Sequence, residues 1–199
     1  MKSNVCKIEN GIRDLEAILQ ESENVANYNG LNQNQTLQLR LLCEEIDGMI
    51  PKITGDFDGD FWIEFENGIC KMNISIELRD FTVEKKKELI SVATNKKNAA
   101  EKGLVSKICS AIEDFFLNEG NYEPYDMAAS CYHLPTELCP GVDYFHLWGL
   151  EQYRNTITLE ENKEACDELE KSIIASIADD VIVGVKGKKA NIVIIKKFA

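Results

Sequence analysis

The sequence predicts an α/β (α+β) protein, a two-layer sandwich whose mixed or antiparallel sheet is covered on one face by helices. Three observations support this fold class. Apolar residues recur with helical spacing in several segments, the spacing switches to strict alternation at residues 61–78, and two further strand-like runs close the chain at 179–198. An isolated hairpin cannot shield its apolar face from water. We therefore expect the two hairpins to join in one sheet beneath the helices.

The composition is that of a globular protein of one domain. The chain has 199 residues, 44% of them apolar and 28% charged, which is enough for a sizeable core. A net charge of −12 argues against binding nucleic acid or anionic membranes through the overall field. No apolar run approaches the ~20 residues of a membrane span, and the N-terminal segment lacks the apolar region of a signal peptide. Seven cysteines without framework spacing favour a reducing compartment, so we expect a cytoplasmic location.

Two helices are expected in the first quarter of the chain. Residues 4–22 carry one apolar stripe, and the polar segment 27–35 reads as a connector. We assign residues 1–30 to this helix and connector, and 31–199 to a single domain with an aromatic-rich insertion at about 118–157. Residues 36–53 form the second predicted helix, with these apolar side chains on one face: Leu39, Leu42, Ile46, Met49, Ile50 and Ile53.

The strongest pattern is a β-hairpin at residues 61–78. Apolar and polar residues alternate on both sides of Asn67-Gly68, a pair that favours the left-handed dihedrals of a type I′ turn. The preceding GDFDGD at 55–60 places acids at alternate positions, but it lacks the glycine and the bidentate glutamate of a calcium loop. We interpret it as a turn between helix and strand.

The middle of the chain is less regular. A short helix is expected at 82–93 and another helix at roughly 99–117. Residues 118–157 contain five of the six tyrosines, both histidines and three of the four prolines, which indicates an aromatic-rich insertion with a helix near 144–155. A capping box then predicts a helix over 159–178, followed by the closing hairpin.

This order, helix then hairpin at 36–78 and again at 159–198, resembles the ATP-binding domain shared by gyrase, histidine kinases, mismatch-repair ATPases and anti-sigma-factor kinases. The layout is most similar to the anti-sigma-factor serine kinases, because the chain ends on a helix and a hairpin with "NIVIIKKF". The resemblance covers roughly residues 31–117 and 158–198. The chain also resembles a group of small gut-bacterial proteins described loosely as ATP-binding. The implied fold is histidine-kinase-type ATPase-like, and the implied ligand is ATP or ADP.

The first motif of that family is Glu-x-x-x-Asn on a helix, where the glutamate orients the attacking water and the asparagine ligates Mg²⁺. The resemblance places Glu45 at the glutamate and Met49 at the asparagine. At 100° per residue, Glu45 lies about 90° from the centre of the apolar stripe, on its flank. A thioether is a poor ligand for a hard cation, so Met49 argues against Mg²⁺ coordination.

The other two motifs have lost their glycines. Asp80 stands where the family's adenine-reading aspartate would stand, but neither glycine of Asp-x-Gly-x-Gly follows it. The Gly-x-Gly loop that would cradle phosphate before the last helix is also missing. If the chain nevertheless binds nucleotide, the phosphate would be held by Lys96, Lys97 or Lys102.

The joint loss of three motifs favours a non-catalytic regulatory or protein-binding module over an enzyme. The aromatic insertion and the basic segment 82–107 would then meet a protein partner, and the anti-sigma resemblance also points to a homodimer. The alternative is an ATP-binding protein with anti-sigma-type serine kinase or ATPase activity, using Glu45 as base and Asp80 for adenine. A purely structural subunit without a ligand is the third interpretation.

A further group of soft or borderline metal ligands lies within sixteen residues: Cys131, His133, Cys139 and His146. Zinc would take four such ligands, but this spacing matches no common structural zinc pattern. We therefore predict no metal site, and we expect buried free cysteines and hydrogen-bonded histidines instead.

Overall fold

The computed structural model describes residues 1–9, 15–49, 57–78, 108, 145–157, 172–186 and 189–198. Within these ranges the elements, in chain order, are β1 (Cys6–Glu9), α1 (Leu15–Tyr28), α2 (Gln33–Met49), β2 (Phe57–Glu66), β3 (Ile69–Leu78), β4 (Phe145–Gly149), α6 (Leu150–Ile157), α8 (Ile173–Ile177), β5 (Asp180–Lys186) and β6 (Lys189–Lys197). The helix expected at 82–93 lies outside the described residues. Ile108, a buried helical residue, is the one described position within the helix expected at 99–117.

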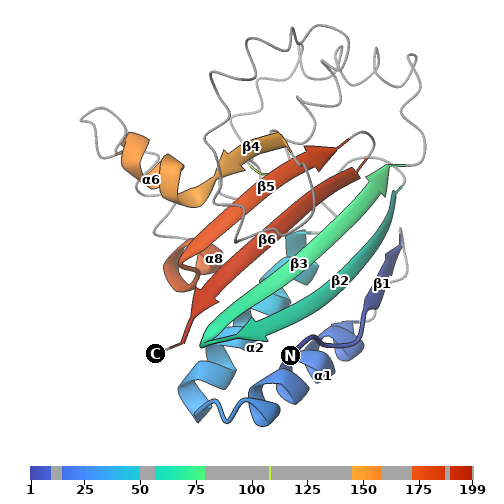
Figure 1. The fold of residues 1–199 in the computed structure, drawn as a ribbon, viewed down its shortest axis with the longest axis vertical. Helices are drawn as coiled ribbons and strands as arrows, with labels where there is room; N and C mark the ends of the chain where they lie inside the picture. Colours follow the sequence, from blue (N-terminus) through green and yellow to red (C-terminus); the bar gives the residue numbers. More distant parts are fainter. Residues whose placement is uncertain are drawn as a thin grey trace, which may run out of the picture.

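The strands form one antiparallel sheet in the order β1-β2-β3-β6-β5-β4 (Figure 1). Hairpins β2–β3 and β5–β6 are joined because β3 pairs with β6, with Met72 opposite Ile194. The predicted joining of two hairpins in one sheet is therefore confirmed. The chain is an α+β protein, and every strand pairing in the described sheet is antiparallel.

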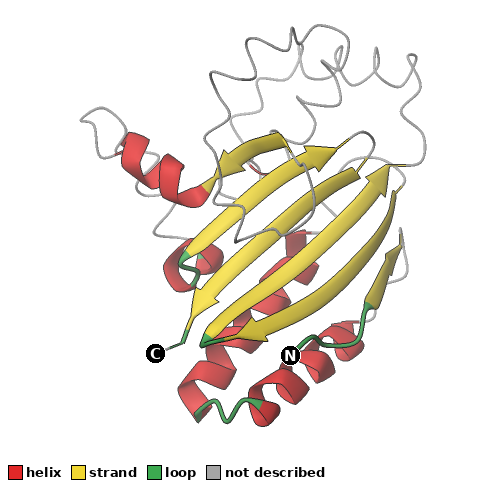
Figure 2. Cartoon of the chain, in the orientation of Figure 1, coloured by secondary structure: helices red, strands yellow, loops and turns green. Residues whose placement is uncertain are grey.

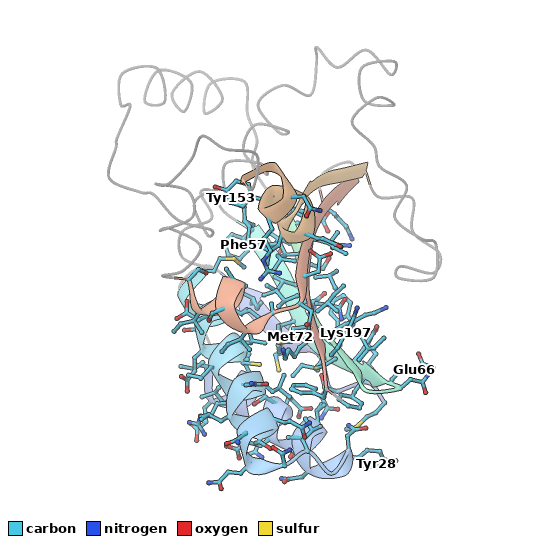
Figure 3. The ribbon with its side chains drawn as sticks, turned by 90° about the vertical axis from the view of Figure 1, so that its left-hand side faces the viewer. Tyr28, Phe57, Glu66, Met72, Tyr153 and Lys197 are labelled. Atoms are coloured by element: carbon cyan, nitrogen blue, oxygen red, sulfur yellow. The ribbon has the colours of Figure 1, made fainter. Side chains whose placement is uncertain are left out.

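Helices α1, α2 and α8 lie on one face of this sheet (Figures 2 and 3). Alternate residues of β2 are buried toward them, which is the pattern expected when one face of a strand meets the core. The core combines sheet side chains such as Phe61 and Met72 with Leu42 and Ile46 of α2, all fully buried. Each side chain of this size stabilises the fold by roughly 1.5–3 kcal/mol when buried.

The turn between β2 and β3 has the predicted type I′ character. Asn67 and Gly68 have φ angles of 51° and 78°, both in the left-handed region. The Phe198 N–H donates to the Gly68 carbonyl oxygen at 2.7 Å, and the Phe198 ring stacks on Phe65 with centroids 6.3 Å apart. The end of the chain is thus fastened to this turn.

We expect Gly68→Ala to lower the free energy of unfolding by about 1–3 kcal/mol. A Cβ on Gly68 would lie 2.7 Å from the Phe198 carbonyl oxygen, in addition to the strain of a positive φ. Urea denaturation would measure the loss. Asn67→Gly is the matched control, because glycine accepts the same φ, and its effect should stay within about 0.5 kcal/mol. Equal stability of the two variants would contradict the described turn.

The prediction of one helix over residues 4–22 is wrong at its start. Cys6 and Ile8 are buried alternately in strand β1, where they pair with Phe61 and Gly59 of β2. Helix α1 begins only at Leu15, and it continues to Tyr28, into the segment expected as a connector. Its buried residues are Ile18, Ser22, Val25 and Ala26. Because the buried stripe has a serine at position 22, the sequence pattern seemed to end there and did not reveal that the helix continues.

Helix α2 also begins earlier than predicted, at Gln33 instead of Thr36. Asn32 Oδ1 accepts a hydrogen bond from the Gln35 N–H at 3.0 Å, and Gln35 Oε1 accepts one from the Asn32 N–H at 3.0 Å. This reciprocal pair is a capping box, which satisfies two backbone donors at the helix start. The segment that looked like a polar connector therefore carries the start signal of the helix.

Two predictions near the end of the chain are corrected as well. Residues 145–149, expected within a helix, form strand β4, because their aromatic and branched residues pair with the open edge of β5. Of the helix expected over 159–178, residues 159–171 lie outside the described residues, and Ser172 is extended (φ −86°, ψ 122°) instead of helical. The Ser172 hydroxyl accepts a hydrogen bond from the Ala175 N–H and so caps the separate helix α8.

Helix α6 is held in place by polar contacts with the start of β5 and the end of α8. The Arg154 guanidinium donates to the carbonyl oxygens of Ala175 and Ala178, which satisfies acceptors at the α8 C-terminus. The Asp180 carboxylate accepts from the Glu151 N–H at 3.0 Å and so caps the first turn of α6. These contacts attach the described part of the insertion to the core sheet.

Candidate functional site

The residues at the family's glutamate and asparagine positions, Glu45 and Met49, both lie on α2. Glu45 is partly exposed, as expected on the flank of the apolar stripe. Met49 is 0% exposed and belongs to the same core as Leu42 and Ile46.

The other candidate nucleotide-binding residues, Asp80, Lys96, Lys97 and Lys102, lie outside the described residues. So do Cys131, His133 and Cys139, three of the four residues weighed as metal ligands. His146 is placed by its backbone in β4, opposite Gly184 of β5. No group of three or more His, Cys, Asp or Glu side chains in the described ranges is arranged to hold a metal ion. No helix in the described part of the chain is long and apolar enough to cross a membrane.

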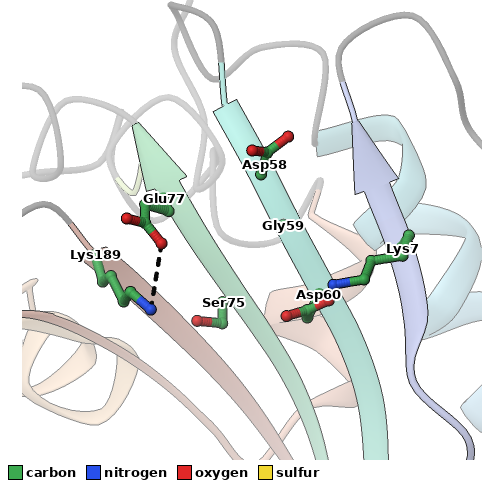
Figure 4. Close-up of a pocket in the computed structure, with 7 residues that line it drawn as sticks. All are labelled: Lys7, Asp58, Gly59, Asp60, Ser75, Glu77 and Lys189. Atoms are coloured by element: carbon green, nitrogen blue, oxygen red, sulfur yellow. Dashed lines mark ion pairs between the residues drawn. The ribbon is translucent and has the colours of Figure 1, made fainter. Parts of the chain in front are cut away.

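The structure contains a polar cavity that the sequence analysis missed. Its volume is about 380 Å³, and it lies on the face of the sheet turned away from α1 and α2 (Figure 4). It is lined by the backbone of Gly59 and by six polar side chains: Lys7, Asp58, Asp60, Ser75, Glu77 and Lys189. The lining residues come from four neighbouring strands, β1, β2, β3 and β6.

Two ion pairs form opposite sides of this cavity. The Lys7 Nζ lies 2.6 Å from Asp60 Oδ1, and the Lys189 Nζ lies 3.2 Å from Glu77 Oε2. Ser75 lies between them, opposite Asp60 in the register of β2 and β3. Both pairs are partly exposed, so solvent screens them and each contributes little to folding stability.

The sequence did contain a signal for this cavity. Asp58 and Asp60 alternate with buried residues, as do Ser75 and Glu77, so all four belong to one face of a hairpin. The interpretation of 55–60 as a turn is wrong for residues 57–60, which are in β2. Lys7 was missed because residues 4–22 were assigned to a helix.

Three buried cysteines lie in the core between the sheet and the helices: Cys6, Cys43 and Cys70. Burial raises the pKa of the Cys70 thiol to about 12. Burial also raises the pKa of Cys43, with a further rise from the neighbouring Cys70 and an opposing effect of a hydrogen bond with Ser22. Thiols held neutral in this way are poor nucleophiles and poor metal ligands.

Comparisons with known proteins add no match. No protein-family model matches the chain, and no curated protein or solved structure matches it either. The function must therefore be argued from the residues and the geometry of the chain itself.

Proposed function

We propose that the chain is a non-catalytic regulatory module that binds a protein partner, with a divergent form of the histidine-kinase-type ATPase fold. The observation that carries this proposal is the complete burial of Met49. In the resembled family that position supplies the oxygen ligand of Mg²⁺. Here it supplies a thioether that packs in the apolar core, which is unsuited to a hard cation.

The arrangement of the elements supports the ATPase-like part of the proposal. Helix α2 precedes hairpin β2–β3, and helix α8 precedes hairpin β5–β6, in the order of the resembled family. The two hairpins join in one sheet, and α1, α2 and α8 cover the same face. A chain that keeps this layout while burying a metal-ligand position is best explained as a binding module without turnover.

The nucleotide part is tested by thermal unfolding with ATP and with ADP, each with and without Mg²⁺. A ligand at 100 times its dissociation constant stabilises a fold by ~2.7 kcal/mol, which shifts the melting temperature of a chain of this size by several degrees. We expect no such shift at millimolar nucleotide. A shift that is lost in Asp80→Ala, together with turnover abolished by Glu45→Ala, would instead establish the kinase or ATPase alternative.

The partner part is tested by affinity capture from native lysate. The basic segment 82–107 gives the bait a local positive charge on an acidic chain, so the captured protein should present an acidic surface. A bait carrying Lys85→Glu, Lys86→Glu and Lys87→Glu should lose that protein and keep the fold. Capture of nothing by the unaltered chain would remove the main support for a partner-binding role.

A further inference from the structure

We propose that Asn67, at the tip of hairpin β2–β3, is a site of spontaneous deamidation, and that isoaspartate formed there detaches Phe198 from this turn. The chain contains two Asn-Gly pairs, Asn67-Gly68 and Asn29-Gly30. Glycine has no side chain to shield its amide from the preceding asparagine, and asparagine is a thermolabile residue. The proposal involves neither a nucleotide nor a partner, so it stands apart from the proposed function and either can fail without the other.

The reaction needs no reagent other than water. The Gly68 amide nitrogen bonds to Cγ of Asn67, the bond from Cγ to the side-chain nitrogen breaks, and ammonia leaves with the proton of the Gly68 amide. The succinimide ring that results takes up one water molecule. Cleavage of the ring between its nitrogen and Cγ gives aspartate. Cleavage between the nitrogen and the main-chain carbonyl carbon gives isoaspartate, whose main chain is longer by one carbon atom.

Both reacting groups at the hairpin tip are free of hydrogen bonds. Asn67 is exposed, and within the described residues neither its side-chain amide nor the Gly68 N–H has a hydrogen-bond partner. In a type I′ turn the ψ angle of the first residue is about +30°, whereas ring closure brings the next nitrogen level with Cβ, at a ψ of roughly −120°. The turn must therefore open before Asn67 can react.

Phe198 restrains this opening. Its N–H donates to the Gly68 carbonyl oxygen at 2.7 Å, and its ring stacks on Phe65 with centroids 6.3 Å apart. Rotation about ψ of Asn67 carries the Gly68 carbonyl group away from Phe198, so the hydrogen bond must break each time the turn opens. The rate of deamidation should therefore report how often Phe198 releases the turn.

The second Asn-Gly pair is restrained at both reacting groups. Asn29 Nδ2, which would leave as ammonia, donates to the Val25 carbonyl oxygen at 2.7 Å. The Gly30 N–H, which would attack, donates to the Asn27 carbonyl oxygen at 3.2 Å. Gly30 is the left-handed residue that ends α1, with a φ of 65°, so this bond belongs to the cap of the helix. The structure therefore favours reaction at Asn67 over Asn29.

Isoaspartate does not fit the turn. Glu66 pairs with Ile69, so only two residues connect the strands, and this connection fixes their register. The contact with Phe198 is also close, since a Cβ added to Gly68 would lie 2.7 Å from the Phe198 carbonyl oxygen. An additional main-chain carbon at position 67 must displace Gly68, and the hydrogen bond to Phe198 is then lost.

The first test is incubation of the full chain in mildly alkaline buffer, with peptide mass spectrometry to follow the exchange of each side-chain NH₂ for OH. We expect Asn67 to deamidate at least about tenfold faster than Asn29 in the folded protein, because both reacting groups at Asn29 must first give up a hydrogen bond. In urea, where both pairs are unfolded, the two rates should become similar. Equal rates in the folded protein, or faster loss of Asn29, overturn the assignment.

The second test changes the restraint. Phe198→Ala should accelerate deamidation of Asn67 at least about threefold, because the aromatic stack on Phe65 is lost, and it should leave Asn29 unchanged. Phe198→Tyr keeps the stack and is the matched control, with the rate of the unaltered chain. An unchanged rate at Asn67 in Phe198→Ala, or equal acceleration of both pairs, would show that Phe198 does not restrain this turn in particular.

The third test concerns the product. The isoaspartate form, separated by chromatography, should unfold at a lower urea concentration than Asn67→Asp. That variant carries the same new charge on an ordinary main chain, and Asp-Gly is itself a favoured type I′ pair, so it isolates the effect of the additional carbon. The amide of Phe198 should also exchange with solvent faster in the isoaspartate form. Equal urea midpoints and equal exchange would contradict the detachment of Phe198.

Discussion

Replacing Met49 with asparagine should cost the protein about 3–5 kcal/mol of its free energy of unfolding. The side chain is 0% exposed, so the substitution removes its apolar burial and leaves an amide group in the core. Loss of the burial accounts for roughly 1.5–3 kcal/mol, and an unsatisfied buried amide adds roughly 1–3 kcal/mol. Urea denaturation would measure the difference, with both curves fitted to one m-value, the dependence of the unfolding free energy on urea concentration.

Met49→Leu is the matched control for this experiment. Leucine has a similar volume and no polar atom, so its effect should stay below about 1.5 kcal/mol. The asparagine variant is informative because asparagine is the residue that the resembled family uses to ligate Mg²⁺. If position 49 faced a nucleotide, Met49→Asn would be tolerated and would gain stabilisation from ATP that depends on Mg²⁺. That result would contradict the proposed non-catalytic role.

The hairpins were predictable because their signals are local and regular. Strict alternation on both sides of Asn67-Gly68 allows one register, which the structure confirms from Phe61 opposite Ile74 to Glu66 opposite Ile69. The pairing continues to Phe57 opposite Leu78, beyond the predicted start of the first strand. The pairing of β3 with β6 followed from the need to cover two apolar hairpin faces at once. Pattern and turn chemistry were sufficient for this half of the fold.

The errors arose where tertiary contacts override the local pattern. Residues 6–9 are too few to distinguish a strand from a helix by periodicity, and their state is decided by the edge that β2 offers. The same holds for β4, whose pairing with β5 replaces an expected helix. The capping box of Asn32 and Gln35 was readable from the sequence, but it was hidden in a run of polar residues.

The site was less predictable than the fold for a physical reason. A motif indicates chemistry only if its side chains converge, and the cavity gathers residues that are up to 182 positions apart, Lys7 and Lys189. Their convergence depends on the order β1-β2-β3-β6, which no single segment encodes. By contrast, the position of Glu45 on the flank of α2 followed from helical geometry alone.

Raising the pH above about 9 should destabilise the protein because the folded state keeps two buried thiols neutral. Burial raises the pKa of Cys70 from its ordinary value of 9.0 to about 12, and the pKa of Cys43 is raised in the same direction. Above about pH 9 the unfolded chain releases these protons while the folded chain retains them. The unfolding free energy therefore falls as the pH rises, by about 1.4 kcal/mol for each thiol between about pH 8 and pH 10.

A variant with Cys43→Ala and Cys70→Ala separates this effect from other groups that titrate in alkali. Lysines and tyrosines ionise equally in both proteins, so the unaltered chain should lose about 3 kcal/mol more than the variant over the same interval. Below about pH 8 the thiols are protonated in both states and the difference should be constant. An equal loss in the two proteins would mean that the thiols reach water in the folded state. In that case Cys43 and Cys70 would be accessible to thiol reagents, and the core between α2 and β3 would be open where the structure places it closed.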